Sequence, residues 1–201
     1  MNKITLAGEI LTTPEYSHEV FGEKFYKFHI CSLRNSGDGD VLPCIASEIF
    51  AKQIDSGDAI KILGEIRTFN ANKHLELNVF AKEIIPYEGR DENKVELDGF
   101  ICKTPIYRKT PRGREITDLL IATNRAYGKS DYIPTIVWGR NAVRAYGYPT
   151  GFHVCMTGRF QSREYEKNNP DGTMSTKIAY ELSASRFDEF KEDVNVSKSY
   201  S

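Results

Sequence analysis

The sequence lacks the features that mark membrane-spanning, secreted and metal-binding proteins. No run of about 18 apolar residues occurs in the chain of 201 residues, and the N-terminus does not show a basic and then apolar signal pattern. The four cysteines are widely separated without a C-x-x-C pair, and the four histidines are scattered. We therefore expect a cytoplasmic protein with reduced thiols and no membrane partner, metal or cofactor.

Signatures of catalysis are also missing. The chain has no Gly-rich phosphate loop, no H-x-x-x-H, no G-x-S-x-G and no cluster of carboxylates. Residues 38–40 (Asp-Gly-Asp) are too short for a calcium loop and lack its terminal glutamate, so we expect a hairpin turn there. The sequence therefore predicts a protein without enzymatic activity.

The chain contains one segment twice. Residues 2–43 align with residues 93–134 at a constant offset of 91 without a gap, and 14 of the 42 aligned positions are identical. A period of about 90 residues is too long for a solenoid repeat and matches the size of a small domain. The repeat therefore predicts two copies of one module.

The repeat continues downstream with insertions, as surface loops allow. Residues 57–64 correspond to 151–158 at an offset of 94, and residues 75–81 correspond to 178–184 at an offset of 103. The second copy thus has nine extra residues between Gly158 and Ile178. Because residues 168–172 read Asn-Asn-Pro-Asp-Gly, which favours a turn, we expect a longer hairpin in the second copy.

The two copies carry opposite net charge. Residues 1–91 hold 10 basic and 14 acidic side chains, a net charge of −4, whereas residues 92–187 hold 15 and 10, a net charge of +5. We expect an acidic module in residues 1–88, a basic module in residues 93–187 and a mobile tail in residues 188–201. A basic module suits a polyanionic partner.

Each copy opens with strand-like alternation of apolar residues, seen at Ile4, Leu6 and Ile10. Further strands are predicted at 25–34 and 41–47, and at 116–125 and 132–138, with short helices at 48–54 and 140–146 before strands four and five. Five strands with a helix between the third and fourth are typical of the OB-fold, a Greek-key barrel, whereas an SH3-like barrel usually lacks that helix. The sequence predicts an all-β protein with two tandem OB-folds.

Three segments of the second copy carry a more specific pattern. Residues 97–113 read LDGFICKTPIYRKTPRG, residues 121–143 read IATNRAYGKSDYIPTIVWGRNAV, and residues 157–172 read TGRFQSREYEKNNPDG. They resemble the bacterial single-stranded DNA-binding protein family, in which a first strand leads to D-P-x-x-R-x-T-x-x-G, a second contains A-x-N-R and a third ends in V-W-G or L-F-G. The resemblance covers about residues 93–187 and reaches the first copy mainly through the internal repeat.

This resemblance implies aromatic side chains that stack on bases. Carried over by position, the stacking residues are Tyr127, Tyr132, Trp138 and Tyr165. Aromatic rings bind strands of any sequence, because every base presents a π-face. A tryptophan at the end of a strand is usually part of the core, so core packing remains the alternative for Trp138.

Basic residues are interleaved with these rings, which a groove that follows a phosphate backbone requires. The predicted phosphate contacts are Arg108, Lys109, Arg112, Arg125, Lys129, Arg140, Arg159 and Arg163. Arg125 has a counterpart, Arg34, in the acidic copy. A structural salt bridge and a shared binding role are both compatible with this pair.

The first copy lacks the four rings. The equivalent positions hold Ser36, Val41, Ser47 and Ala71. Together with its negative charge, this predicts weak nucleic-acid binding or a role in assembly for the first module. The glycines shared by the copies (8 and 99, 57 and 151, 64 and 158) are better explained by bulges, turns and bends of a barrel than by ligand contact.

The leading hypothesis is sequence-independent binding of single-stranded DNA, which would protect it in replication, recombination or repair. A protein-interaction scaffold in a replication or mobile-element complex and an RNA-binding protein are the alternatives. The resemblance implies four OB-folds per functional unit, hence a homodimer. The acidic C-terminal tip of the family is absent from a chain that ends Val-Ser-Lys-Ser-Tyr-Ser, which argues against recruitment of partners through the tail.

Overall fold

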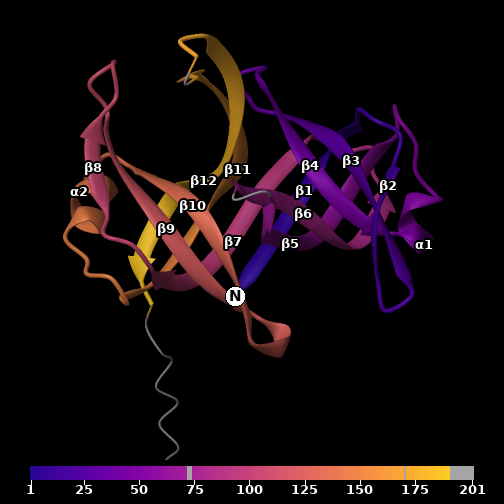
Figure 1. The fold of residues 1–201 in the computed structure, drawn as a ribbon, viewed down its shortest axis with the longest axis horizontal. Coiled ribbons are helices and arrows are strands. Elements are labelled where there is room, and N and C mark those ends of the chain that lie inside the picture. The colour runs from indigo at the N-terminus through magenta and orange to yellow at the C-terminus, as the bar shows by residue number, and fades with distance from the viewer. Residues whose placement is uncertain (72–73, 170, 191–201) are drawn as a thin grey trace, which may run out of the picture.

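The computed structural model describes residues 1–71, 74–169 and 171–190, and Figure 1 shows two barrels side by side. Within the described residues, no helix is long and apolar enough to cross a membrane. The elements are β1 (Asn2–Ile10), β2 (Glu15–Val20), β3 (Glu23–Leu33), β4 (Gly39–Ser47), α1 (Glu48–Ala51), β5 (Ala59–Ala71), β6 (His74–Pro86), β7 (Glu92–Ile101), β8 (Ile106–Lys109), β9 (Glu115–Arg125), the 3₁₀ helix η1 (Ala126–Gly128), β10 (Lys129–Trp138), α2 (Arg140–Tyr146), β11 (His153–Asn168) and β12 (Met174–Glu189).

Each half of the chain closes into a five-stranded barrel. The first barrel has the order β1, β3, β4, β6, β5, and β1 closes it by pairing with both β5 and β3. The second barrel repeats this order with β7, β9, β10, β12 and β11. The pairs β4–β6 and β10–β12 are parallel, and the other neighbours within each barrel are antiparallel. The prediction of an all-β protein with two tandem OB-folds is confirmed.

The structure adds one strand to the five predicted for each barrel. Strand β2 pairs with β3, and β8 pairs with β9, each on the side away from the rest of the barrel. All six residues of β2 are exposed, and β8 has only four residues. A pattern-based prediction depends on alternating burial, so these two strands gave it no signal.

A β-bulge at a glycine bends the same strand in each barrel. The register shifts between Leu63 and Gly64 in β5, and between Thr157 and Gly158 in β11. A Cβ atom at either glycine would lie 2.2 Å from a backbone carbonyl oxygen, that of Phe80 or Ser183. Only glycine fits at these two bulges, in agreement with the structural role predicted for this pair.

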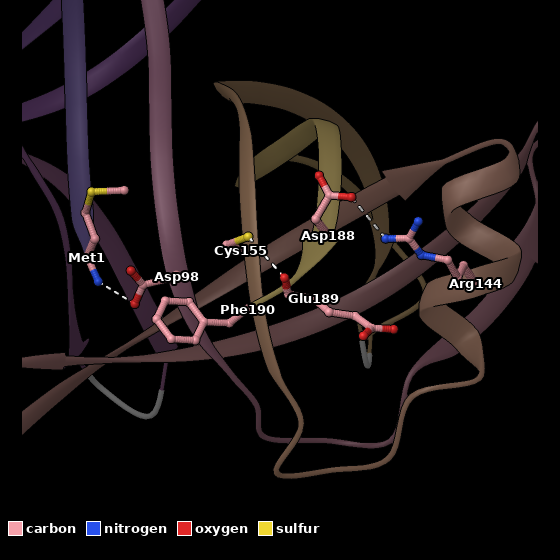
Figure 2. A pocket seen from close by; sticks show the side chains of 7 residues that line it. All are labelled: Met1, Asp98, Arg144, Cys155, Asp188, Glu189 and Phe190. Carbon is pink, nitrogen blue, oxygen red and sulfur yellow. Dashed lines mark hydrogen bonds and ion pairs between the residues drawn. The ribbon is translucent and has the colours of Figure 1, made fainter. Parts of the chain in front are cut away.

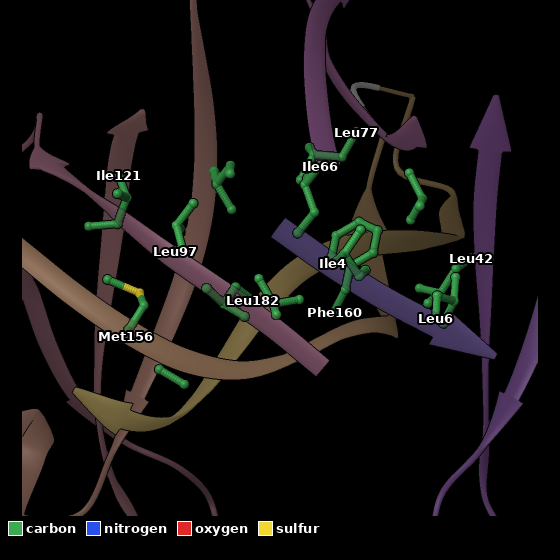
Figure 3. Close-up of a cluster of buried hydrophobic side chains, with 14 of the residues drawn as sticks. Ile4, Leu6, Leu42, Ile66, Leu77, Leu97, Ile121, Met156, Phe160 and Leu182 are labelled. Atoms are coloured by element: carbon green, nitrogen blue, oxygen red, sulfur yellow. The ribbon is translucent and has the colours of Figure 1, made fainter. Parts of the chain in front are cut away.

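One hydrophobic core extends through both barrels. Alternate residues of β1 and β7 point inward, and Ile4, Leu6 and Leu97 are completely buried. Figure 3 shows Ile4 and Leu6 of the first barrel in the same cluster as Leu97, Phe160 and Leu182 of the second. The barrels therefore pack as one unit.

The first strands of the two barrels pair with each other in antiparallel orientation. Asn2 lies opposite Leu97, and Leu6 lies opposite Asn93. Since each residue of the first copy corresponds to the residue 91 positions later, a twofold rotation exchanges these two pairs. The tandem repeat thus forms, within one chain, the isologous contact that is usual between two subunits.

Two buried aspartates follow the same symmetry at the junction of the barrels. Asp40 on β4 is 0% exposed, and Asp131 on β10 is 1% exposed. Asp131 accepts the backbone N–H of Thr68 at 2.7 Å, and Asp40 accepts that of Ser162 at 3.3 Å. Each carboxylate thus reaches from one barrel to the long hairpin of the other and fixes their relative orientation.

The hairpin of β11 and β12 is longer than its counterpart in the first barrel. Its strands have 16 residues each, against 13 each for β5 and β6. The N–H of Asn169 donates to the carbonyl of Thr173 at 2.8 Å, which closes the turn. The longer hairpin predicted here is therefore present, and Figure 1 shows it rising between the two barrels.

The last described strand ends close to the N-terminus. β12 continues to Glu189, so the predicted tail boundary at residue 188 falls inside this strand. Phe190 stacks on His153 with ring centroids 3.9 Å apart. Figure 2 shows the neighbouring cleft, where the N-terminal amino group lies 2.5 Å from Asp98. Residues 191–201 of the predicted tail lie outside the described residues.

Candidate nucleic-acid interface

The pleat of β10 places two predicted stacking residues on one face. Tyr132 and Trp138 are separated by an even number of residues, so their side chains point to the same side of the strand. Ile133 and Val137, at odd spacing from Tyr132, are completely buried in the core. Tyr132 and Trp138 therefore lie on the outer face of the second barrel.

Tyr132 lies where β10 meets the first barrel. Its side chain is 44% exposed, and its backbone N–H donates to Oγ1 of Thr68 on β5 at 2.9 Å. The hydrogen bond fixes the backbone and leaves the ring at the surface. An exposed ring on a fixed backbone can stack on a base with little loss of conformational entropy.

Trp138 lies at the other end of β10 and is half-buried. Its indole N–H donates to Oγ of Ser183 on β12 at 3.0 Å. The indole is not part of the buried cluster that forms the core, and its assignment to base stacking stays a prediction. The hydrogen bond holds the ring along the outer face.

The outer face continues from β10 across β12 to β11. Ser183 on β12, which accepts the hydrogen bond from Trp138, lies opposite Arg159 on β11. Arg163 and Tyr165 follow Arg159 along β11 at even spacing, so their side chains point to the same side of the sheet. Tyr165 is 40% exposed, and the guanidinium of Arg163 lies 5.8 Å from the centre of its ring. Three of the predicted stacking residues thus share one continuous surface.

Tyr127, the fourth predicted stacking residue, belongs to η1 between β9 and β10. Its side chain lies outside the described part of the structure. Its assignment to base stacking stays a prediction.

Four predicted phosphate contacts are exposed cations without an ion-pair partner among the described residues. They are Lys109, Arg112, Lys129 and Arg140. Because these groups hold no carboxylate, phosphate can bind them without breaking a protein contact.

Arg108 and Arg163 are exposed but paired. Arg108 forms two hydrogen bonds with Asp118, at 2.5 and 3.0 Å, and these bonds raise the pKa of the arginine. Arg163 donates to Glu181 at 3.3 Å. The Arg108–Asp118 pair is open to solvent on both sides and contributes little to stability, so a phosphate can replace its carboxylate, whereas Glu181 is only 8% exposed.

Arg125 and Arg159 belong to the junction of the barrels. Arg125 lies 3.5 Å from the buried Asp131, and Arg159 pairs with the buried Asp40, which also binds Arg34 at 2.5 Å. Burial lowers the pKa of Arg159. Since Arg34–Asp40 corresponds to Arg125–Asp131 under the repeat, Arg125 takes part in a structural salt bridge, one of the two roles considered for it.

The corresponding face of the first barrel has no rings at these positions. Val41 and Ser47 are half-buried on β4, and the side chain of Ala71 lies outside the described part of the structure. Lys27 on β3 and Glu76 on β6 form an ion pair at 3.9 Å that spans β4 between them. This face is thus partly covered by its own side chains.

The acidic partners of the basic residues were missed by the sequence analysis. Asp118 and Glu181 hold the exposed arginines, and Asp131 holds Arg125. The available signal was their position, since Asp118 and Glu181 occupy outward positions on strands of a basic barrel. Which arginine each carboxylate binds depends on strand register, which the sequence pattern does not give.

Known proteins match this chain. The model of the single-strand binding protein family matches residues 92–188. Single-stranded DNA-binding protein 2 of Streptococcus agalactiae serotype V is 30% identical over 114 residues, which are 52% of this chain and 87% of that protein. The chain belongs to the single-strand binding protein family. Single-stranded DNA-binding protein 1 of Staphylococcus aureus strain COL is 31% identical over 93 residues, 43% of this chain and 56% of that protein.

A solved structure of this family matches both barrels. The wild-type single-stranded DNA binding protein from Thermus aquaticus has a TM-score of 0.71 and 20% sequence identity, over 95% of this chain and 93% of that chain. A deletion mutant of the same protein has a TM-score of 0.72 over 98% of both chains. At 20% sequence identity the match shows the fold alone, and it extends over both barrels.

Proposed function

We propose that the second barrel binds single-stranded DNA without sequence preference and without catalysis. The observation that carries this proposal is the single outer face shared by Tyr132, Trp138 and Tyr165, with exposed cations around it. Membership of the single-strand binding protein family supports it, as do the names of the relatives.

The chemistry of this face suits unpaired bases. Each ring stacks on one base and contributes about 1–3 kcal/mol, and stacking does not read base edges, so the sequence of the strand has little influence. The exposed cations Lys109, Arg112, Lys129 and Arg140, unpaired among the described residues, bind phosphates and release counterions. Binding therefore weakens as the salt concentration rises.

Trp138 provides the direct test, because it is the only tryptophan of the chain. Titration with oligo(dT) is expected to quench its fluorescence strongly, and less so at high salt. Trp138→Phe keeps an aromatic ring and serves as the matched control for Trp138→Ala in affinity measurements. Absence of quenching together with unchanged affinity of Trp138→Ala would contradict the stacking assignment.

DNA is proposed as the ligand in preference to RNA or a protein partner. Oligonucleotides of matched sequence in competition distinguish the first two, because RNA carries the 2′-hydroxyl that proteins use for recognition. A preference for RNA would favour the RNA-binding alternative. Failure to bind either strand would favour a protein-interaction scaffold.

We also propose that the protein protects single-stranded DNA during replication, recombination or repair in the cytoplasm, as a homodimer with four OB-folds. The dimer-like contact of β1 with β7 already joins two OB-folds in one chain, so two chains would supply four. Sedimentation equilibrium should give about twice the chain mass of 22.8 kDa. A monomer mass at micromolar concentration would exclude the homodimer there.

A further inference from the structure

The outer face of the first barrel carries an aromatic cluster at positions where the second barrel has none. Phe80 on β6 packs against Phe25 on β3, with ring centroids 5.8 Å apart, and His18 on β2 stacks on Phe25 at 5.1 Å. The residues equivalent to Phe80 and Phe25 in the second barrel are Ser183 and Ile116. The first barrel therefore lacks the four predicted stacking rings of the second barrel but carries aromatic rings at other positions of its outer face.

An arginine covers the exposed side of this cluster. The guanidinium carbon of Arg67 lies 3.4 Å from the centre of the Phe80 ring, which is the spacing of stacked planar groups. The Nε atom of Arg67 is buried and has no hydrogen-bond partner among the described residues. Arg67 thus occupies the place on Phe80 that a nucleobase would take, at the expense of a hydrogen bond.

A buried amide with no partner lies beside this arginine. Asn78 is the register partner of Arg67 and is 2% exposed. Neither Nδ2 nor Oδ1 of Asn78 has a hydrogen-bond partner within the described part of the chain. At the equivalent position of the second barrel, Glu181 accepts hydrogen bonds from Gln161 and Arg163. A buried amide left without partners is unusual in a folded protein and calls for a ligand or another explanation.

This cluster borders the face proposed for DNA. The residue after Arg67 is Thr68, which binds both Asp131 and the backbone of Tyr132 in the second barrel. Burial is the main cause that lowers the pKa of Arg67 and Arg125 adds to it, whereas Glu65, 3.5 Å away, and Asp131 act in the opposite direction. Movement of Arg67 to a phosphate would relieve its burial, and the phosphate would replace Glu65 as its anionic partner.

We propose that the first barrel holds a latent nucleobase pocket, in which Arg67 occupies the stacking place on Phe80 until a base of single-stranded DNA displaces it. The base then stacks on Phe80, its edge exchanges hydrogen bonds with the amide of Asn78, and Arg67 binds the adjacent phosphate. This inference rests on the proposed function, because it extends the path of the same strand from the second barrel to the first.

The test compares two lengths of oligo(dT) on the full chain. One OB-fold occupies about 4–16 nucleotides, so an oligonucleotide of about 12 nucleotides reports on one barrel and one of about 32 nucleotides reaches both. Phe80→Leu keeps the apolar contact with Phe25 and removes the ring. It is expected to weaken binding of the long strand by about five-fold to 150-fold and to leave the short strand unchanged.

Asn78→Leu is the second variant; it keeps the branching and the number of side-chain heavy atoms and has no polar atoms. If Asn78 binds a base, this variant weakens binding of the long strand. If the amide is only an unsatisfied polar group, the variant raises the melting temperature without any effect on the long strand. Unchanged long-strand binding in both Phe80→Leu and Asn78→Leu would overturn the proposed pocket.

Arg67→Ala tests the movement of the arginine. Loss of one phosphate contact should lower the slope of log K against log salt by about 0.7 for the long strand only. Lys52→Ala, which removes an exposed cation just after α1, is the control and should leave the slope unchanged. An unchanged slope in Arg67→Ala would remove the phosphate contact from the proposal. Failure of the unmodified protein to bind even the short strand would instead contradict the proposed function.

Discussion

The two barrels share a backbone and differ in their outer faces. Strand order, the glycine bulges and the paired aspartates at the junction repeat from one barrel to the other. On the outer face, the second barrel presents Tyr132 and Trp138 where the first has Val41 and Ser47. Features that determine folding were thus kept in both copies, while the surface diverged in charge and in the placement of its rings.

The difference also concerns which side chains cover each face. In the first barrel, Lys27 and Glu76 form an ion pair across β4, and Arg67 covers Phe80. In the second, the position equivalent to Lys27 holds Asp118, which binds Arg108 at the edge of the sheet. Ala179 occupies the position equivalent to Glu76, so among the described residues the second face forms no ion pair that corresponds to Lys27–Glu76.

The junction should give the largest effect, because its carboxylates are buried. Asp40→Ala removes the partner of both Arg34 and Arg159, and we expect it to lower the free energy of unfolding by about 3 kcal/mol, since both arginines are partly exposed. Asp131→Ala should cost about 2 kcal/mol, mainly through the lost partner of the Thr68 N–H. Urea denaturation measures both values. Equal losses would show that the second arginine bound to Asp40 contributes nothing to the free energy of unfolding.

The next effect concerns the outer faces. Tyr132→Ala should weaken binding of a short oligo(dT) by about 1–3 kcal/mol, because it removes one stacking ring. Val41→Ala, at the equivalent position of the first barrel, should change affinity by less than about 0.5 kcal/mol. Tyr132→Phe is the control that retains the ring. Similar losses in Tyr132→Ala and Val41→Ala would mean that the two faces are equivalent for short strands.

The smallest effect concerns the turns that join β2 to β3 and β8 to β9. Arg112 and Phe21 occupy equivalent positions after β8 and β2, and both are exposed. Arg112→Ala should lower the slope of log K against log salt by about 0.7, because one phosphate contact is lost, whereas Phe21→Ala should leave it unchanged. Titrations at several salt concentrations decide this. Equal slopes for both variants would remove Arg112 from the phosphate contacts.

The barrels themselves could be predicted closely. The helix predicted at residues 140–146 is α2 (Arg140–Tyr146), and the strand predicted at 41–47 lies within β4 (Gly39–Ser47). The helix predicted at 48–54 is shorter, with α1 ending at Ala51. These elements bury one side against the core, so their residue patterns carry a periodic signal, and the repeat supplied each pattern twice.

The candidate site could be predicted only in part. The resemblance to the family supplied Tyr132 and Trp138 as stacking residues, and both lie on the outer face of β10. The eight predicted phosphate contacts were treated alike, but Arg159 binds a buried aspartate of the other barrel, whereas Lys129 is exposed. Charge and residue type are the same for bound and unbound arginines, so the sequence pattern could not separate them.

What the sequence alone determined is the repeated barrel and the side of each strand that faces outward, because burial on one side of a strand leaves a period of two in the residues themselves. The tertiary structure alone decided how the barrels meet and which cations have no ion-pair partner in the part of the chain that the structure describes. Asp40 finds its partners Arg159 and Ser162 in the other barrel, more than a hundred residues along the chain, and no local pattern records a contact that forms only when both barrels are folded.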